Sequence, residues 1–258
     1  MSHWSTATIN RAMTWPASAH VPRLLEGDVH VWLADLNDRV EPFGKLASIL
    51  SEAERERAAR FYFERDAIRW MVSRVVLRSI LGRYVGVGAS DVRFQIGARG
   101  KPELSAPLGP RLQFNASHSD RLGLYVMARS GRVGVDIERV RPLPDLEAIA
   151  GRTFSPHEQQ ALGAVSPAKR CAAFFNCWTR KEAYIKALGD GLTYPLERFT
   201  VSLIPGAPPK LEDVQDDPAE ARRWSLTALA PAAGYAAALA TEGRPPRLRC
   251  AQWQGRER

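Results

Sequence analysis

The chain has 258 residues, of which 45% are hydrophobic and 25% charged, which is ordinary usage for a globular protein with a substantial core. No apolar run is long enough to span a bilayer, and the N-terminal residues lack the apolar stretch of a secretory signal. The cysteine count of 3, without metal-ligand or disulfide spacing, suits a reducing compartment. We therefore expect a cytoplasmic protein that is not associated with a membrane.

The charge balance is strongly basic. A net charge of +8 and a pI near 9.7 predict an anionic partner. Nucleic acids, acidic proteins and phosphorylated small molecules all meet that description, so charge alone leaves the partner open.

Taken in chain order, the sequence repeats itself with an offset a little above one hundred residues. Residues 1–22 have no counterpart and are predicted to be an N-terminal extension, followed by halves at 23–130 and 131–258. Each half is predicted to contain a strand, two helices and about three further strands, an α+β unit. Chance similarity of two such halves is the alternative. If the halves are duplicates, they pack together and leave a cleft of the kind that binds small molecules.

Matching signals in the two halves support the duplication. Ser51 and Ser155 each precede a glutamate by three residues, the capping box of a helix N-terminus. The following helices are expected to end at Gly82 and Gly189. The matched strands are expected at 29–36 and 133–140, at 91–96 and 197–203, and as pairs within 112–129 and 224–241.

The strand at 133–140 carries two carboxylates. Val133, Val135 and Ile137 alternate with Gly134, Asp136 and Glu138, so one face of the strand is apolar and the other holds both acids, roughly 7 Å apart. On a solvated face this pair is ordinary. In a cleft the two charges repel, and they need a cation or a proton between them.

A third carboxylate interrupts the apolar stripe of the helix that runs through residues 177–189. Glu182 occupies the stripe between Trp178 and Ile185, where an unpaired charge is costly. Lys186, one turn later, is the simple partner, but an exposed pair of this kind contributes only a few tenths of a kcal/mol. The alternative is that Glu182 joins Asp136 and Glu138 around a hard cation. An all-oxygen ligand set favours magnesium over zinc.

Two other polar segments are weak signals by themselves. Residues 114–120, FNASHSD, end an apolar run with hydrogen-bonding side chains, and residues 100–102 are Gly-Lys-Pro. Each is also an ordinary turn composition.

Together these segments resemble one family. GKPEL (100–104), FNASHSD (114–120), VGVDIERV (133–140) and FFNCWTRKEAYIKALGDGL (174–192) occur in the order and spacing of the Sfp-type 4′-phosphopantetheinyl transferases, and RFYFERDAIRWMVSRVVLR (60–78) is similar as well. The resemblance covers roughly residues 50 to 204. It implies a pseudo-dimer of two similar α/β subdomains, with the active site and bound coenzyme A at their interface.

The resemblance also implies an activity and its cofactors. The family transfers the phosphopantetheine arm of coenzyme A to a serine of an apo acyl or peptidyl carrier protein. The reaction is Mg²⁺-dependent and releases adenosine 3′,5′-bisphosphate. Carrier proteins are typically acidic, which suits a basic enzyme. By resemblance the enzyme is a cytoplasmic monomer whose partners include neither nucleic acid nor a membrane.

Site residues follow from the matching positions. Asp136, Glu138 and Glu182 match magnesium ligands, and Lys186 matches the lysine at the pyrophosphate. The implied coenzyme A contacts are Arg57, Arg69, Lys101, Ser117, His118, Asp136, Lys181 and Lys186. Glu54 falls where some members carry a lysine, which puts one phosphate contact in doubt. The implied catalytic residues are Glu182 and Lys186. Whether Glu182 itself or a water that it activates takes the serine proton is left open.

Two alternatives remain at this point. A non-enzymatic nucleic-acid-binding protein fits the basic charge but has no use for converging carboxylates. A family member that binds coenzyme A without transfer would differ only in activity. The sequence does not distinguish fatty-acid, polyketide and peptide-synthetase carriers, nor does it settle whether acylated coenzyme A is accepted.

Overall fold

The computed structural model describes residues 5–6, 13–18, 20–37, 43–97, 100–106, 112–189 and 194–255. Much of the predicted N-terminal extension and the end of the last motif, residues 190–192, lie outside the described residues. Among those that are described, no helix has the length and apolar character needed to cross a membrane.

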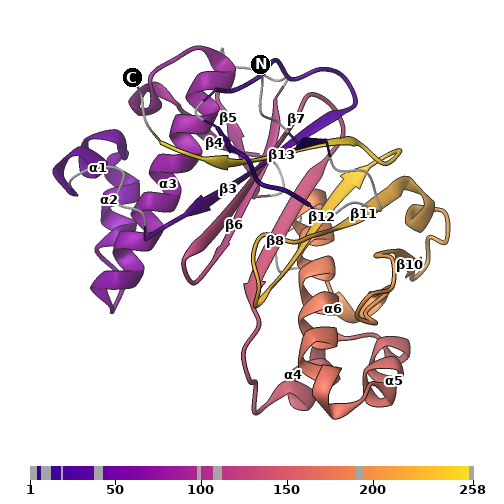
Figure 1. The fold of residues 1–258 in the computed structure, drawn as a ribbon. Helices are drawn as coiled ribbons and strands as arrows, with labels where there is room; N and C mark the ends of the chain where they lie inside the picture. Colours follow the sequence, from indigo (N-terminus) through magenta and orange to yellow (C-terminus); the bar gives the residue numbers. More distant parts are fainter. Residues whose placement is uncertain are drawn as a thin grey trace.

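The first half contains a long helix on a sheet (Figure 1). Strand β3 (Asp28–Asp35) is followed by three helices, α1 (Phe43–Ile49), α2 (Glu52–Ala58) and α3 (Glu64–Val85). A short hairpin of β4 (Phe94–Ile96) and β5 (Pro102–Leu104) and a long one of β6 (Gln113–Ser119) and β7 (Leu122–Ala128) complete it.

The second half repeats this order. Strand β8 (Val133–Arg139) leads to helices α4 (Leu146–Thr153), α5 (Pro156–Ala164) and α6 (Pro167–Leu188). The short pair β9 (Phe199–Val201) and β10 (Leu211–Val214) and the long pair β11 (Trp224–Leu229) and β12 (Tyr235–Glu242) follow. The two halves therefore share one order of elements, as duplication predicts.

Two details of the predicted repeat are wrong. Among the described residues, each half has three α-helices before its hairpins, because α1 and α4, with 7 and 8 residues, are too short to show a helical period clearly. Helix α3 also continues through Gly82 and ends at Gly86, whose φ is +76°. Gly82 is instead required for close packing, since a Cβ there would lie 2.6 Å from the carbonyl oxygen of Val87.

The last strand joins the other half. Strand β13 (Arg247–Trp253) pairs in parallel with β3. Two short strands, β1 (Ser5–Thr6) and β2 (Ala17–Ser18), also pair with β13. The order of the sheet is β1-β13-β3-β7-β6. Figure 1 shows this yellow strand among the purple ones. The predicted boundary of 131–258 is corrected here, because residues 247–253 complete the sheet of the first half. The remaining division at 22 and 130 stays a prediction.

The halves pack as four layers. Helix α3 covers one face of the β3 sheet, and α6 covers one face of the β11-β12-β8 sheet. The other faces of the two sheets pack against each other through a buried apolar cluster from β3, β7, β8, β12 and β13, which includes Val31, Val126, Ile137 and Leu239. The predicted α+β pseudo-dimer is thus observed, with β6 and β8 adjacent at the junction.

Candidate active site between the two halves

The carboxylate strand and the carboxylate helix are in direct backbone contact. A Cβ added to Gly134 of β8 would lie 2.2 Å from the carbonyl oxygen of Ala183 and 2.4 Å from the amide nitrogen of Ala187 on α6. Only glycine allows this approach. It brings Asp136 and Glu138, on the same face of β8 as Gly134, next to Glu182 and Lys186.

Lys186 binds the strand instead of its own helix. Its Nζ donates to Oδ1 of Asp136 at 2.5 Å and to Oγ of Ser117 at 2.9 Å. Ser117 also donates to the same Asp136 oxygen at 2.8 Å. The expected helical pair with Glu182 is therefore replaced by a contact between α6, β6 and β8.

The remaining carboxylate oxygens have the character of cation ligands. Oδ2 of Asp136 and Oε1 of Glu182 are buried without a hydrogen-bond partner, an arrangement that is costly unless something else is bound. Burial and repulsion by Asp136 raise the pKa of Glu182. Burial also raises the pKa of Glu138, with a smaller contribution from Asp136.

These oxygens fit magnesium by chemistry, although the cluster is not closed around a cation. In the part of the chain that the structure describes, no three His, Cys, Asp or Glu side chains are already arranged to hold a metal ion. One reason is that the Lys186 ammonium holds Oδ1 of Asp136. Magnesium commonly uses only one or two protein carboxylates and completes its shell with water and phosphate, so Asp136 Oδ2 and Glu182 Oε1 are sufficient to begin a site.

Side chains of β6 hold β8 in place. Strand β8 is at the edge of its own sheet, where backbone N–H groups need other partners. The amide of Val135 donates to Oδ1 of Asn115 at 3.0 Å, and the amide of Arg139 donates to Oγ of Ser119 at 3.1 Å. Ser119 in turn donates to Glu138 at 2.7 Å. Residues 113–119 thus form a strand, in agreement with the strand pair predicted within 112–129. Asn115 and Ser119 are further candidate site residues, which the sequence analysis did not name. The alternation of polar residues at 115, 117 and 119 was the available signal.

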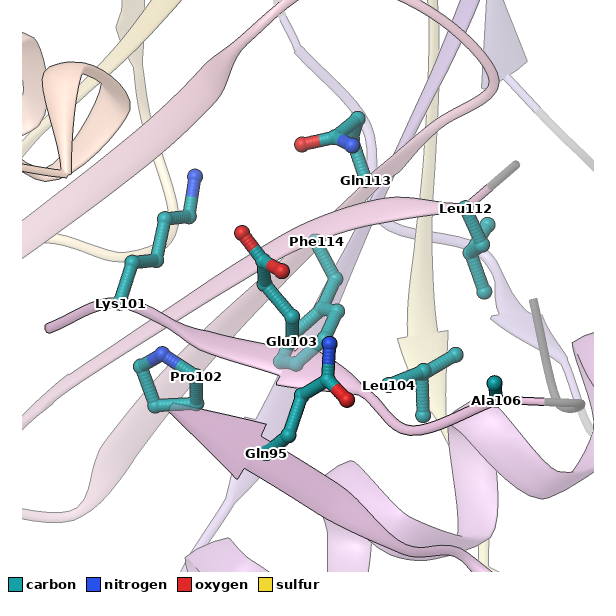
Figure 2. A pocket seen from close by; sticks show the side chains of 9 residues that line it. All are labelled: Gln95, Lys101, Pro102, Glu103, Leu104, Ala106, Leu112, Gln113 and Phe114. Carbon is teal, nitrogen blue, oxygen red and sulfur yellow. The ribbon is translucent and has the colours of Figure 1, made fainter. Parts of the chain in front are cut away.

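Lys101 lines a neighbouring hollow of about 250 Å³. Figure 2 shows Lys101, Glu103 and Gln113 around the same space, with Phe114 beside them. The Lys101 Nζ donates to the carbonyl oxygen of Val133 at 2.8 Å, and burial lowers its pKa to about 8. The hollow thus adjoins the first residue of the carboxylate strand.

Comparisons with known proteins agree with this geometry. Residues 132–240 match the "4'-phosphopantetheinyl transferase superfamily", and residues 37–130 match "4'-phosphopantetheinyl transferase, N-terminal". The chain is 39% identical over 231 residues to 4'-phosphopantetheinyl transferase HetI of Nostoc sp., covering 89% of this chain and 94% of that protein. This chain is a 4′-phosphopantetheinyl transferase family member. It is also 37% identical over 159 residues to 4'-phosphopantetheinyl transferase Sfp of Bacillus subtilis, covering 62% of this chain and 69% of that one.

One residue carried over from the transferase family lies elsewhere. Lys181 has a side chain only 1% exposed, and its Nζ binds Glu158 at 2.8 Å and the carbonyl oxygens of Leu196 and Phe199 at 2.8 and 2.6 Å. The predicted contact of Lys181 with coenzyme A is corrected, because successive residues of a helix point about 100° apart. Glu182 faces the β8 carboxylates, whereas Lys181 faces the core at Glu158.

The other transferase half contains the same arrangement. Glu54, the capping-box glutamate of α2, binds Arg78 of α3 at 2.7 Å, and Arg78 donates to the carbonyl oxygen of Val92 at 2.8 Å. Glu54 and Glu158, and Arg78 and Lys181, occupy matching positions. A glutamate at position 54 is therefore part of the scaffold of the transferase.

The remaining predicted contacts lie at the edge of the site. His118 lies beside Ser117 with part of its side chain in solvent; crowding by neighbouring groups, which removes some of its hydration, and the Lys186 charge lower its pKa. Arg57 is exposed and stacks over Trp70 with 5.7 Å to the ring centroid. Arg69 binds Asp120 at 2.7 Å and Asn37 at 2.9 Å. Nucleotide contacts by these residues stay predictions, and Arg69 would have to exchange partners to make one.

Proposed function

We propose that this chain transfers the 4′-phosphopantetheine arm of coenzyme A to a serine of an apo acyl or peptidyl carrier protein, with Mg²⁺ as cofactor and adenosine 3′,5′-bisphosphate as the second product. The observation that carries the proposal is the pair of unpartnered buried oxygens, Asp136 Oδ2 and Glu182 Oε1, beside the Lys186 ammonium. A cation held by these oxygens and the ammonium next to it would together offset the negative charge of a pyrophosphate.

The residues of the cluster would share the work. Asp136, Glu138 and Glu182 would hold the magnesium ion, which when bound neutralises phosphate charge and stabilises the leaving group. The Lys186 side chain is 29% exposed, so its ammonium can also donate to a phosphate oxygen. Ser117 keeps Asp136 and Lys186 in register by bonding to both.

Glu182 is the best-placed base. The carrier serine Oγ attacks the β-phosphorus, a new P–O bond forms, and the bond from that phosphorus to the bridging oxygen breaks. The bridging oxygen leaves with the electron pair as part of adenosine 3′,5′-bisphosphate. The serine proton goes to Glu182, directly or through a water.

The nucleotide end of coenzyme A fits the first half. The hollow at Lys101 offers an ammonium, the Gln95 and Gln113 amides and the Phe114 ring, with the Glu103 carboxylate beside them, a mixture suited to hydrogen bonds with a base. His118, beside Ser117, would also contact the adenosine or its 3′-phosphate. Arg57 and Arg69 are proposed for the outer phosphate.

The partner would be an acidic carrier protein, attracted to a chain with a net charge of +8. We propose that the enzyme is a monomer and acts in the cytoplasm, where its cysteines would remain reduced. Cys171, Cys177 and Cys250 are free thiols in the structure.

A transfer assay tests the function. Purified protein is mixed with fluorescent coenzyme A and a panel of apo carriers of the fatty-acid, polyketide and peptide-synthetase types, with Mg²⁺ or with a chelator. Label should enter at least one carrier, and only with the metal. Asp136→Ala should lower the rate by at least about a hundredfold, whereas Asp213→Ala, an exposed strand carboxylate, should not. Coenzyme A binding without transfer to any carrier, or full transfer in chelator, would contradict the proposal.

A further inference from the structure

Asp120 forms the turn of the β6–β7 hairpin in a conformation that asparagine, aspartate and above all glycine tolerate. Ser119 pairs with Leu122 across the hairpin, so only Asp120 and Arg121 form the loop. The φ angle of Asp120 is +51°. An aspartate here is slightly strained relative to glycine, which raises the question of what its side chain does.

The side chain of Asp120 joins elements of both halves. Oδ1 accepts from Arg69 of α3 at 2.7 Å, and Oδ2 accepts from Arg139 at the end of β8 at 2.9 Å. Tyr235 of β12 also donates to Oδ2, at 3.4 Å. The Arg69 and Asp120 side chains are only 14% and 25% exposed, so solvent screens this pair less than an ordinary surface pair.

The hairpin that ends at Asp120 carries the hydroxyls that hold the carboxylates. Ser119 is its neighbour and binds Glu138, and Ser117 binds Asp136. Arg139, which the Asp120 carboxylate holds, directly follows Glu138 in β8. The ion pair between Asp120 and Arg139 therefore connects the hairpin tip to β8, and the serines of the same hairpin orient the β8 carboxylates.

We propose that Asp120 is a positioning residue for the transfer reaction, which holds the hairpin tip against β8 so that Ser117 and Ser119 keep Asp136 and Glu138 in place. The inference rests on the proposed function. It assigns to Asp120 no contact with substrate or metal.

Two variants separate position from stability. Asp120→Asn keeps a residue that tolerates positive φ and removes the charge. Asp120→Gly removes the charge and relieves the backbone. The matched controls are Asp216→Asn and Asp216→Gly, because Asp216 also has a positive φ, of +69°, and also pairs with an arginine, Arg198, away from the site.

The measurements are kcat, the Mg²⁺ concentration for half-maximal rate, the melting temperature, and its rise on adding Mg²⁺ with coenzyme A. Both Asp120 variants should lose kcat by about tenfold to a hundredfold, as a misplaced site does. Both should need more Mg²⁺ and show a smaller ligand-induced rise in melting temperature. The Asp216 controls should behave as wild type in all of these. Arg139→Gln should have the same effects as Asp120→Asn, and the double variant should be no worse than either single variant.

The outcomes are distinct. If folded Asp120 variants keep wild-type kcat and Mg²⁺ requirement, the inference is wrong, whatever happens to their melting temperature. If they lose stability alone, Asp120 is a structural residue only. Failure of the proposed function would look different, since wild type would then transfer nothing and gain no stability from Mg²⁺ with coenzyme A.

Discussion

Nζ of Lys186 on α6 lies 2.5 Å from Oδ1 of Asp136 on β8. This contact joins the helix and the strand that bear the candidate catalytic groups. It takes the place of a pair between Lys186 and Glu182 within the helix. It leaves Oδ2 of Asp136 and Oε1 of Glu182 without protein partners.

Lys186→Ala tests a role in the chemistry. Because Lys186 pairs with the buried Asp136, the variant should lose stability whether or not the ammonium acts on the phosphate, so kcat is compared in the folded protein. If Lys186 stabilises the departing phosphate, kcat should fall tenfold to a thousandfold, on the order of 1.4–4 kcal/mol of barrier. Lys186→Arg should restore only part of the rate, because its planar fork places the charge differently. Steady-state rates with melting curves test this, and an unchanged kcat in the alanine variant would remove Lys186 from the chemistry.

Lys181→Ala should have the opposite effect. Its partner Glu158 is 0% exposed, so removing the lysine leaves a buried unpaired carboxylate and should destabilise the fold by about 3–5 kcal/mol. The KM for coenzyme A of the folded fraction should stay near that of wild type. Chemical denaturation measures the first quantity and steady-state kinetics the second. Lys169→Ala, exposed on the same helix, is the control. A raised KM with normal stability would restore Lys181 as a phosphate contact.

Gly134→Ala should separate the strand from the helix. The new Cβ would lie 2.2 Å from the Ala183 carbonyl oxygen, so α6 has to move and Glu182 with it. We expect a fall in kcat of about a hundredfold, with a smaller change in the KM for coenzyme A, whose nucleotide end is proposed to bind the first half. Gly163→Ala in α5, where nothing lies within 4 Å, should be neutral or stabilising. Wild-type kcat in folded Gly134→Ala would show that the spacing is not critical.

Glu182→Gln should stabilise the metal-free protein at neutral pH. Burial and Asp136 raise the pKa of Glu182 in the folded state, so its charged form destabilises the fold, and this cost disappears as the pH falls through the raised pKa. The variant should therefore melt above wild type at pH 7 to 8, by a margin that shrinks towards pH 5. Adding Mg²⁺ with coenzyme A should reverse the order. The exposed Glu197→Gln is the control, and identical pH profiles for Glu182→Gln and wild type would argue against this account.

Coenzyme A binding should weaken above about pH 8. Burial lowers the pKa of Lys101 to about 8, so its ammonium is present below that pH and lost above it. The KM for coenzyme A, measured from pH 6.5 to 9.5, should rise through this region in wild type. In Lys101→Arg the charge persists, and the rise should be absent. A rise of equal size in that variant would place the titrating group elsewhere.

Local patterns allowed much of this protein to be predicted from its sequence. Ser51 and Ser155 form the predicted capping boxes, and residues 133–139 form the predicted strand with Asp136 and Glu138 on the face that meets α6. These features depend on residues a few positions apart, and the sequence contains that information. The interruption of the stripe at Glu182 is likewise visible in the sequence, and its role in a site stays a prediction.

Only the tertiary structure decided between neighbours in a motif and between partners far apart in the chain. Lys181 and Lys186 look equivalent in the sequence, yet helical rotation buries one against Glu158 and directs the other to Asp136. The side chains of Asn115 and Ser119 lie at the site because they accept hydrogen bonds from the backbone amides at the open edge of β8. Strand β13 belongs to the sheet of the first half because its backbone pairs with β3. The partner of each of these groups depends on which backbone amides, carbonyls and charges remain without a partner after the two halves have packed together. The local sequence does not contain that information.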